Sequence, residues 1–250
     1  MIVVVGDSYC MDYVADCNNK LSAIKNIWLN QNKPLKDLSP NLSEWKYMEP
    51  FTIWPDIISK HLNLPLTNLS QQGIGNSAIY SKALDIIVND KVDDIKKLIV
   101  VWSGSNRISY EQTGGWWKRY DETYLDGKIQ KGIDVPIKGL LKDYMRYIYS
   151  LQEICKSKNI DVLMCQSVNI IGLEKWSIEL GNQLLDSPYY KKIDRSIFPD
   201  FPGHTDLDGK CFSDVMSKDN NYEKSMLNKI DQHPNEFGNK LIAEHVKGLL

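Results

Sequence analysis

Three polar residues of the types that acyl transfer requires stand near the two ends of the sequence. Ser8 follows a short apolar run, and Asp231 precedes His233 by two positions near the other end. A serine hydroxyl is a weak nucleophile alone, so it needs a base that removes its proton and a group that orients this base. Imidazole can accept a proton near neutral pH and later return it. These residues therefore indicate nucleophilic attack on a carbonyl, provided that the fold brings them together.

Such an attack also needs hydrogen-bond donors for the negative charge that develops on the carbonyl oxygen. The candidates are the backbone N–H of Ser8, the backbone N–H of Gly73 and the side-chain amide of Asn106. Gly73 suits this role because a residue without Cβ lets the backbone approach a ligand closely. Ser8, Gly73 and Asn106 thus form a candidate oxyanion site.

The elements that must position these residues follow from the hydrophobic pattern. Apolar runs of strand length alternate with segments of helical period, which predicts an α/β fold with a parallel sheet and helices on both faces. The expected strands are 1–5, 64–69, 97–102 and 160–166, and the expected helices include 51–62, 77–89, 137–158 and 236–250. In such sheets ligands bind outside the carboxyl ends of the strands. The turns that carry Ser8, Gly73 and Asn106 are therefore expected at one edge.

The length of 250 residues fits one domain, 1–250, with long loop insertions near 31–49, 108–136 and 168–229. Loops of this length are uncommon unless they are functional. We expect the loops beside Ser8 to form the substrate cleft. Trp116 and Trp117 lie in the second insertion, where they either stack on a sugar ring, cap the core or form a contact between subunits.

Composition excludes several classes of protein. The net charge of −2 argues against a nucleic-acid binder, and no apolar stretch is long enough for a membrane span. No secretory leader is visible, which predicts synthesis in the cytoplasm, and five cysteines without a CxxC pair fit reduced thiols. The sequence contains neither an HExxH motif nor a Cys/His cluster, the patterns that would indicate a metal site. The glycine pattern at 73–78 follows the second strand rather than the first, so a dinucleotide cofactor is not expected.

The candidate residues lie in four short motifs, and this set resembles the SGNH, or GDSL, hydrolase family. The motifs, in the order of that family, are Gly6-Asp7-Ser8, Asn68 with Gly73, Gly104-Ser105-Asn106, and Asp231-Gln232-His233-Pro234. The resemblance implies a flavodoxin-like three-layer α/β/α sandwich with a central parallel sheet. It also implies ester hydrolysis through an acyl-serine, without a cofactor, on a small-molecule or glycan ester. Many members remove acetyl or longer acyl groups from carbohydrates or lipids.

Two positions depart from the family pattern. Ile230 stands where the family has the aspartate of the triad, and Arg107 stands where an aspartate follows the asparagine. Pro234 favours an extended backbone at His233, and residues two apart in an extended segment point to the same side. We therefore predict that Asp231 contacts the His233 ring; otherwise the pair works as a Ser-His dyad. Arg107 is either a surface residue or binds an anionic group of the substrate.

Three functional readings remain open from the sequence. The first is a serine esterase that removes O-acetyl or other acyl groups from a carbohydrate. The second is a non-catalytic binding or structural module on the same fold. The short Asp-Gln-His-Pro-Asn segment resembles SGNH-like bacteriophage proteins, and such a module would be associated with a virion. The third is an acyltransferase that uses the same residues with another acceptor.

Overall fold

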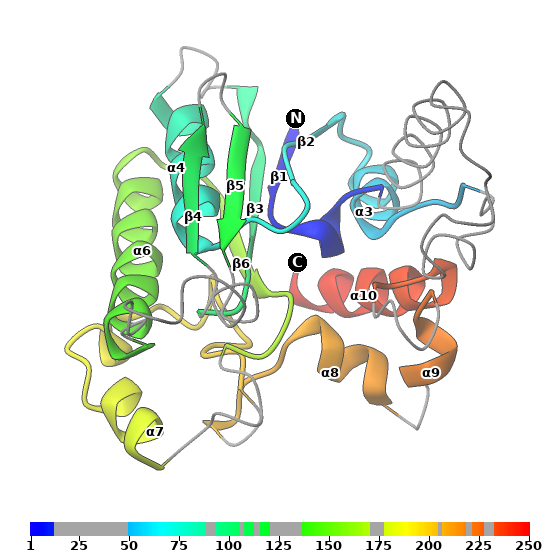
Figure 1. The fold of residues 1–250 in the computed structure, drawn as a ribbon. Coiled ribbons are helices and arrows are strands. Elements are labelled where there is room, and N and C mark those ends of the chain that lie inside the picture. Colours follow the sequence, from blue (N-terminus) through cyan, green and yellow to red (C-terminus); the bar gives the residue numbers. More distant parts are fainter. Residues whose placement is uncertain are drawn as a thin grey trace, which may run out of the picture.

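The computed structural model describes residues 1–12, 50–88, 94–105, 108–112, 116–120, 137–170, 178–204, 207–218, 222–227 and 233–250. Its centre is a parallel sheet of four strands (Figure 1): β1 (Ile2–Val5), β2 (Leu66–Asn68), β3 (Lys97–Trp102) and β6 (Val162–Gln166). The strand order is β2-β1-β3-β6. This order matches the first four positions of the flavodoxin-like arrangement, so the α/β fold class is confirmed.

Helices cover both faces of this sheet (Figure 1). One face packs against α4 (Asn76–Val88) and α6 (Ile137–Ser157), and the other against α3 (Trp54–Leu62), α8 (Phe212–Ser217) and α10 (Glu236–Leu249). Along β1 the side chains alternate: Val3 and Val5 face the first set of helices, and Ile2 and Val4 face the second. Both faces are buried, which is why the strands read as continuous apolar runs rather than as alternating ones.

The register of the sheet brings three turns to one edge. Val5 at the end of β1 lies beside Val100 of β3, and Trp102 at the end of β3 lies beside Gln166 of β6. All three strands run in the same direction, so the segments that follow them leave the sheet side by side. Ser8 stands in the first of these segments.

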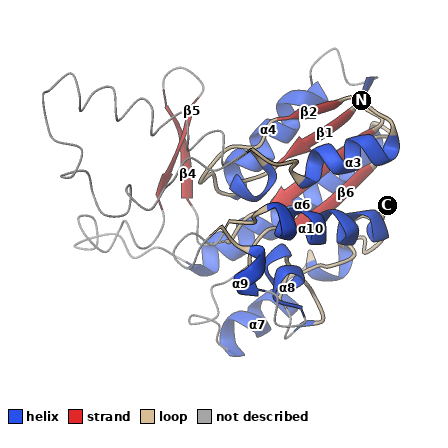
Figure 2. Cartoon of the chain, turned by 90° about the vertical axis from the view of Figure 1, so that its right-hand side faces the viewer, coloured by secondary structure: helices blue, strands red, loops and turns tan. Residues whose placement is uncertain are grey.

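The long insertions contain more regular structure than the sequence suggested. Within 108–136, the strands β4 (Ile108–Gln112) and β5 (Trp116–Tyr120) pair antiparallel in a hairpin separate from the main sheet (Figure 2), and β4 lies beside α4. Within 168–229, the chain forms α7 (Ile178–Leu185), the 3-10 turn η5 (Tyr190–Lys192), α8 and α9 (Tyr222–Ser225). The stretch 31–49 lies outside the described residues. In the part of the chain that the structure describes, no helix is long and apolar enough to cross a membrane.

Candidate active site

Ser8 and His233 meet at the carboxyl edge of the sheet. Ser8 begins the 3-10 turn η1 (Ser8–Cys10) directly after β1, and His233 lies just ahead of α10. The Ser8 Oγ and His233 Nε2 atoms are 2.6 Å apart, which is hydrogen-bond distance across 225 positions of sequence. Ser8 is only 4% exposed. A hydroxyl this close to an imidazole nitrogen has the geometry of a nucleophile beside its base.

The turn that presents Ser8 is held by the carboxylate of Asp7, which is fully buried. Asp7 Oδ1 accepts from the Tyr9 N–H at 3.0 Å, which caps the turn. Asp7 Oδ2 accepts from the hydroxyls of Ser103 and Ser167, each at 2.8 Å. These serines directly follow β3 and β6, so one carboxylate joins the ends of three strands beneath Ser8.

Ser103 also fixes the segment that leads toward Asn106. Its N–H donates to Asn76 Oδ1 at 2.8 Å, and its carbonyl accepts from Asn76 Nδ2 at 3.0 Å and from Gln166 Nε2 at 2.9 Å. Asn76 and Gln166 are both buried, so these bonds are protected from water. The turn after β3 is therefore held from α4 and from β6.

Ser105, two residues further along, is also held by hydrogen bonds. Ser105 donates to the Ile170 carbonyl through its N–H at 2.7 Å and through its hydroxyl at 2.6 Å. Asn106 itself, with Arg107, lies outside the described residues. Its role as an oxyanion donor stays a prediction, and the bonds on Ser103 and Ser105 are the local restraints that would position it.

Gly73 lies in the turn between β2 and α4, and this turn is tied to the Ser8 turn. The Gln71 N–H donates to the Gly6 carbonyl at 3.1 Å. Gly73 is buried and has φ +72°, a left-handed conformation that favours glycine. Among the described residues, neither the Ser8 N–H nor the Gly73 N–H donates to a backbone carbonyl. Both groups thus remain candidates for the oxyanion site.

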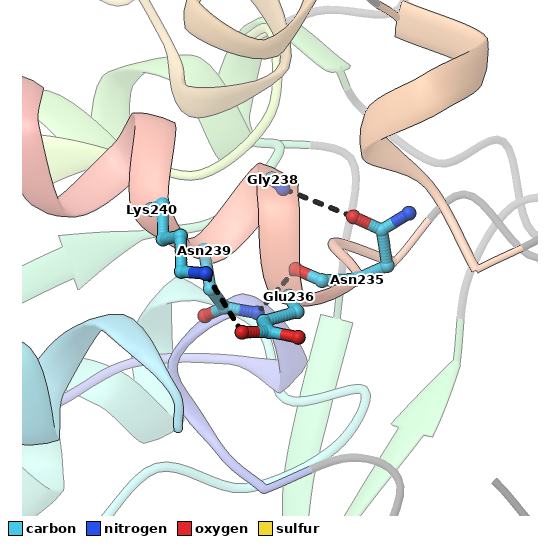
Figure 3. Close-up of polar contacts among 5 residues, drawn as sticks. All are labelled: Asn235, Glu236, Gly238, Asn239 and Lys240. Atoms are coloured by element: carbon cyan, nitrogen blue, oxygen red, sulfur yellow. Dashed lines mark hydrogen bonds and ion pairs between the residues drawn. The ribbon is translucent and has the colours of Figure 1, made fainter. Parts of the chain in front are cut away.

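The segment that carries His233 is fixed by its own backbone and by Asn235. The His233 carbonyl accepts from the Leu227 N–H at 2.9 Å, and Pro234 forms a bridge with Met226. The Asn235 side chain caps α10 by accepting from the Gly238 N–H at 3.0 Å (Figure 3), and its amide donates to the Met226 carbonyl at 2.8 Å. A Cβ at Gly238 would collide with the Ser225 carbonyl, so α9 and α10 approach closely only because this residue is glycine.

Asn239 and Trp54 connect the two halves of the site. Asn239 Nδ2 donates to the Asn235 carbonyl at 3.0 Å (Figure 3), and Asn239 Oδ1 accepts from the Trp54 N–H at 2.9 Å. The indole N–H of Trp54 donates to the Tyr9 carbonyl at 2.9 Å. The histidine segment and the serine turn are therefore both anchored to the first residue of α3.

Two candidates remain, Asp231 and Cys10, and only Cys10 is among the described residues. Asp231, predicted to orient His233, lies outside the described residues, so this prediction stays open. Burial, with a smaller contribution from the charge of Asp7, raises the pKa of the Cys10 thiol well above its usual range. Cys10 therefore remains protonated and does not compete with Ser8. Within the described part of the chain, no group of acidic, histidine or cysteine residues could hold a metal ion.

Sequence reasoning did not assign roles to several supporting residues. Asp7 and Ser167 each follow a predicted strand, where polar turn residues are ordinary, and Asn239 lies in a predicted helix. The sequence therefore indicates no role for these three side chains. The available signal is a polar residue in a segment that is otherwise buried, but such a signal does not name the partner.

Comparison with known proteins gives distant similarities. No family model and no curated protein sequence matches the chain. Several solved structures resemble it along its length, among them a G-D-S-L family protein, a lipase and an esterase. A protein assigned to the lipolytic G-D-S-L family, from Desulfitobacterium hafniense DCB-2, is 14% identical with a TM-score of 0.47, covering 100% of this chain and 98% of that chain. The lipase Lip_vut3 from a goat rumen metagenome is 13% identical with a TM-score of 0.49, covering 99% and 96%.

The third structure is the acetyl xylan esterase AlAXEase, 12% identical with a TM-score of 0.43, covering 100% of this chain and 98% of that chain. All three carry the name of a lipolytic or esterase protein. What the residues of this chain do is inferred below from their own geometry.

Proposed function

We propose that the protein is an SGNH-type serine esterase that cleaves an ester through an acyl-serine intermediate. The observation that carries the proposal is the 2.6 Å contact between Ser8 Oγ and His233 Nε2. Hydrogen bonds to Asp7 on one side and to Asn235 and Asn239 on the other fix both partners. A rigid nucleophile and base supply the positioning that an acyl-transfer reaction needs.

The first half of the reaction forms the acyl-enzyme. His233 Nε2 takes the hydroxyl proton as Ser8 Oγ bonds to the carbonyl carbon of the ester. The carbonyl oxygen becomes an oxyanion, for which the N–H groups of Ser8 and Gly73 and the amide of Asn106 are the proposed donors. The tetrahedral intermediate then collapses. The bond to the alcohol oxygen breaks, and the imidazolium returns its proton to that oxygen.

The second half releases the acid. Water replaces the alcohol, and His233 removes a proton from it as its oxygen attacks the acyl-serine carbonyl. Collapse of this intermediate breaks the bond to Ser8 Oγ, which recovers the proton from His233. The protein supplies the nucleophile, the base and the donors, so no cofactor takes part in the proposed cycle.

The proposed substrate is an O-acylated carbohydrate, and the proposed acyl group is acetyl. Two features support this choice: the sequence resemblance to the SGNH family, and the paired tryptophans Trp116 and Trp117 in β5. Indole rings provide flat apolar faces of the kind that pack on sugar rings. The virion association indicated by the sequence stays a prediction.

The experiment is a comparison of two substrates with wild-type protein and Ser8→Ala. Wild-type protein should hydrolyse p-nitrophenyl acetate and release acetate from an acetylated xylo-oligosaccharide, and Ser8→Ala should do neither. Ser59→Ala is a matched control. The Ser59 hydroxyl lies outside the site and donates to the Leu64 carbonyl, with 2.6 Å between the two oxygen atoms. Full hydrolysis by Ser8→Ala would refute the assignment of the nucleophile. Hydrolysis of only the small ester would refute the proposed carbohydrate substrate.

A further inference from the structure

The side chain next to the nucleophile contacts the base. Tyr9 follows Ser8 in η1, and its ring centroid lies 5.7 Å from that of the His233 imidazole, with a tilt of 44° between the planes. Tyr9 is only 6% exposed, so the contact is mostly shielded from water. A cation within about 6 Å of an aromatic ring is attracted by the negative face of that ring, and more strongly where water is excluded.

The backbone that carries the Tyr9 ring is held on both sides. The Tyr9 N–H donates to Asp7 Oδ1 at 3.0 Å, and the Tyr9 carbonyl accepts from the Trp54 indole N–H at 2.9 Å. Trp54 is in turn bonded to Asn239 of α10, at 2.9 Å. The bonds that fix the serine turn therefore also fix the backbone position from which the ring reaches the base.

We propose that Tyr9 is a positioning residue that orients the His233 ring and stabilises its protonated form during the reaction. This inference rests on the proposed function, because in the reaction His233 becomes an imidazolium when it takes the proton of Ser8. The positive charge then forms on an imidazole whose centroid lies 5.7 Å from that of an aromatic ring that is already in place. The stabilisation is greater for the charged ring than for the neutral one, so it favours the transition state over the ground state.

Other charged groups belong to the elements around this ring. They include Asp7, whose carboxylate is bonded beneath Ser8, Asp12 after η1, Asp56, Lys60 and His61 of α3, Glu223 and Lys224 of α9, and Glu236 of α10. Glu236 is exposed and pairs with Lys240 at 2.7 Å (Figure 3). None of these groups changes when only residue 9 is varied. A series of variants at this position therefore isolates the contribution of the ring.

The test is a series at position 9 in the full-length protein: Tyr9→Phe, then phenylalanines with one, two and three ring fluorines, then Tyr9→Leu. Fluorine weakens the negative face of the ring with little change in size, so this part of the series tests charge stabilisation without a loss of packing. We expect Tyr9→Phe to restore activity relative to Tyr9→Leu. From the unfluorinated ring to the ring with three fluorines, kcat should fall progressively by about three- to tenfold, with a smaller change in KM.

The pH profile separates this role from simple packing. If the ring stabilises the protonated imidazole, weakening the ring should move the acidic limb of kcat/KM to lower pH with each added fluorine. Tyr80→Leu is a matched control. Tyr80 lies outside the site and stacks on Tyr147, with 4.9 Å between the ring centroids, so its loss should leave the acidic limb of kcat/KM in place.

Proton NMR of the imidazole C–H signals gives a readout that needs no turnover, with the His233 signal assigned from His233→Gln. A titration midpoint that falls with fluorination supports the inference even if no ester is hydrolysed, in which case the proposed function alone fails. A series in which neither kcat, the acidic limb nor the NMR midpoint changes would overturn the role of Tyr9.

Discussion

Replacing Asp7 by asparagine should destabilise the protein and displace the nucleophile, although the two side chains have almost the same shape. Asp7 is fully buried and accepts hydrogen bonds from the Tyr9 N–H and from the hydroxyls of Ser103 and Ser167. Hydrogen bonds to a charged group contribute about 1–1.5 kcal/mol more than neutral ones. An amide has only one acceptor oxygen, so either the two hydroxyl bonds must rearrange or the Tyr9 N–H loses its acceptor. We therefore expect the free energy of unfolding to fall by about 2–3 kcal/mol.

The assay is urea denaturation, followed by kinetics under conditions where the variant is folded. Ser167→Ala removes one donor and should cost less than Asp7→Asn, whereas the control Ser59→Ala, with its hydroxyl bond outside the site, should cost about 1 kcal/mol or less. Asp7→Asn should also lower kcat, because the turn that presents Ser8 loses its anchor to two strands. An Asp7→Asn protein within about 0.5 kcal/mol of wild type would refute the view that this carboxylate holds the strand ends together.

Three further predictions concern residues for which the sequence alone gives a role. Asn106→Ala should lower kcat by about 10²–10³ with KM nearly unchanged, measured on p-nitrophenyl acetate, and a wild-type kcat would rule out its role as an oxyanion donor. Asp231→Asn should lower kcat by up to about 10⁴ while Gln232→Ala has little effect, and near-normal activity of Asp231→Asn would indicate a dyad. Replacing Trp116 and Trp117 by alanine should impair release of acetate from an acetylated oligosaccharide more than hydrolysis of a small ester, and equal losses would point to a structural role.

The central sheet could be predicted because β1, β3 and β6 are buried on both faces. The run Lys97–Trp102 coincides with β3, and 160–166 contains β6 (Val162–Gln166). Burial on both faces removes polar residues from a strand, which leaves a strong local signal. The terminal helix was found for a similar reason, since α10 has an apolar side packed on the sheet and begins at an asparagine cap.

The insertions were harder because their elements are short and lack such a signal. The helices α8 and α9 span only 212–217 and 222–225, and the hairpin β4–β5 is separate from the main sheet. Short elements depend on tertiary contacts more than on their own propensity. An example is the approach of α9 to Gly238 of α10, which joins segments that no local pattern connects.

The pairing of Ser8 with His233 was predicted from residue type and position, but its supports were not. Ser103 and Ser167 lie 96 and 160 positions from Asp7, and nothing in a single sequence states that their hydroxyls share one carboxylate. The ring contact between Tyr9 and His233 depends in the same way on the turn geometry of η1. Contacts of this kind follow from the fold, and therefore appear only once the chain is folded.

The most direct test of the central claim is to locate the residue that a fluorophosphonate probe modifies, by mass spectrometry of the digested protein. An activated serine attacks the phosphorus of the probe, gives its proton to the base and displaces fluoride, so that a stable phosphonate ester remains on the serine oxygen. We predict a single adduct on Ser8 in wild-type protein, no adduct in Ser8→Ala, and strongly slowed labelling in His233→Ala, because the base 2.6 Å from the hydroxyl is then lost. An adduct on another residue, or labelling of Ser8 at the wild-type rate in His233→Ala, would contradict the account.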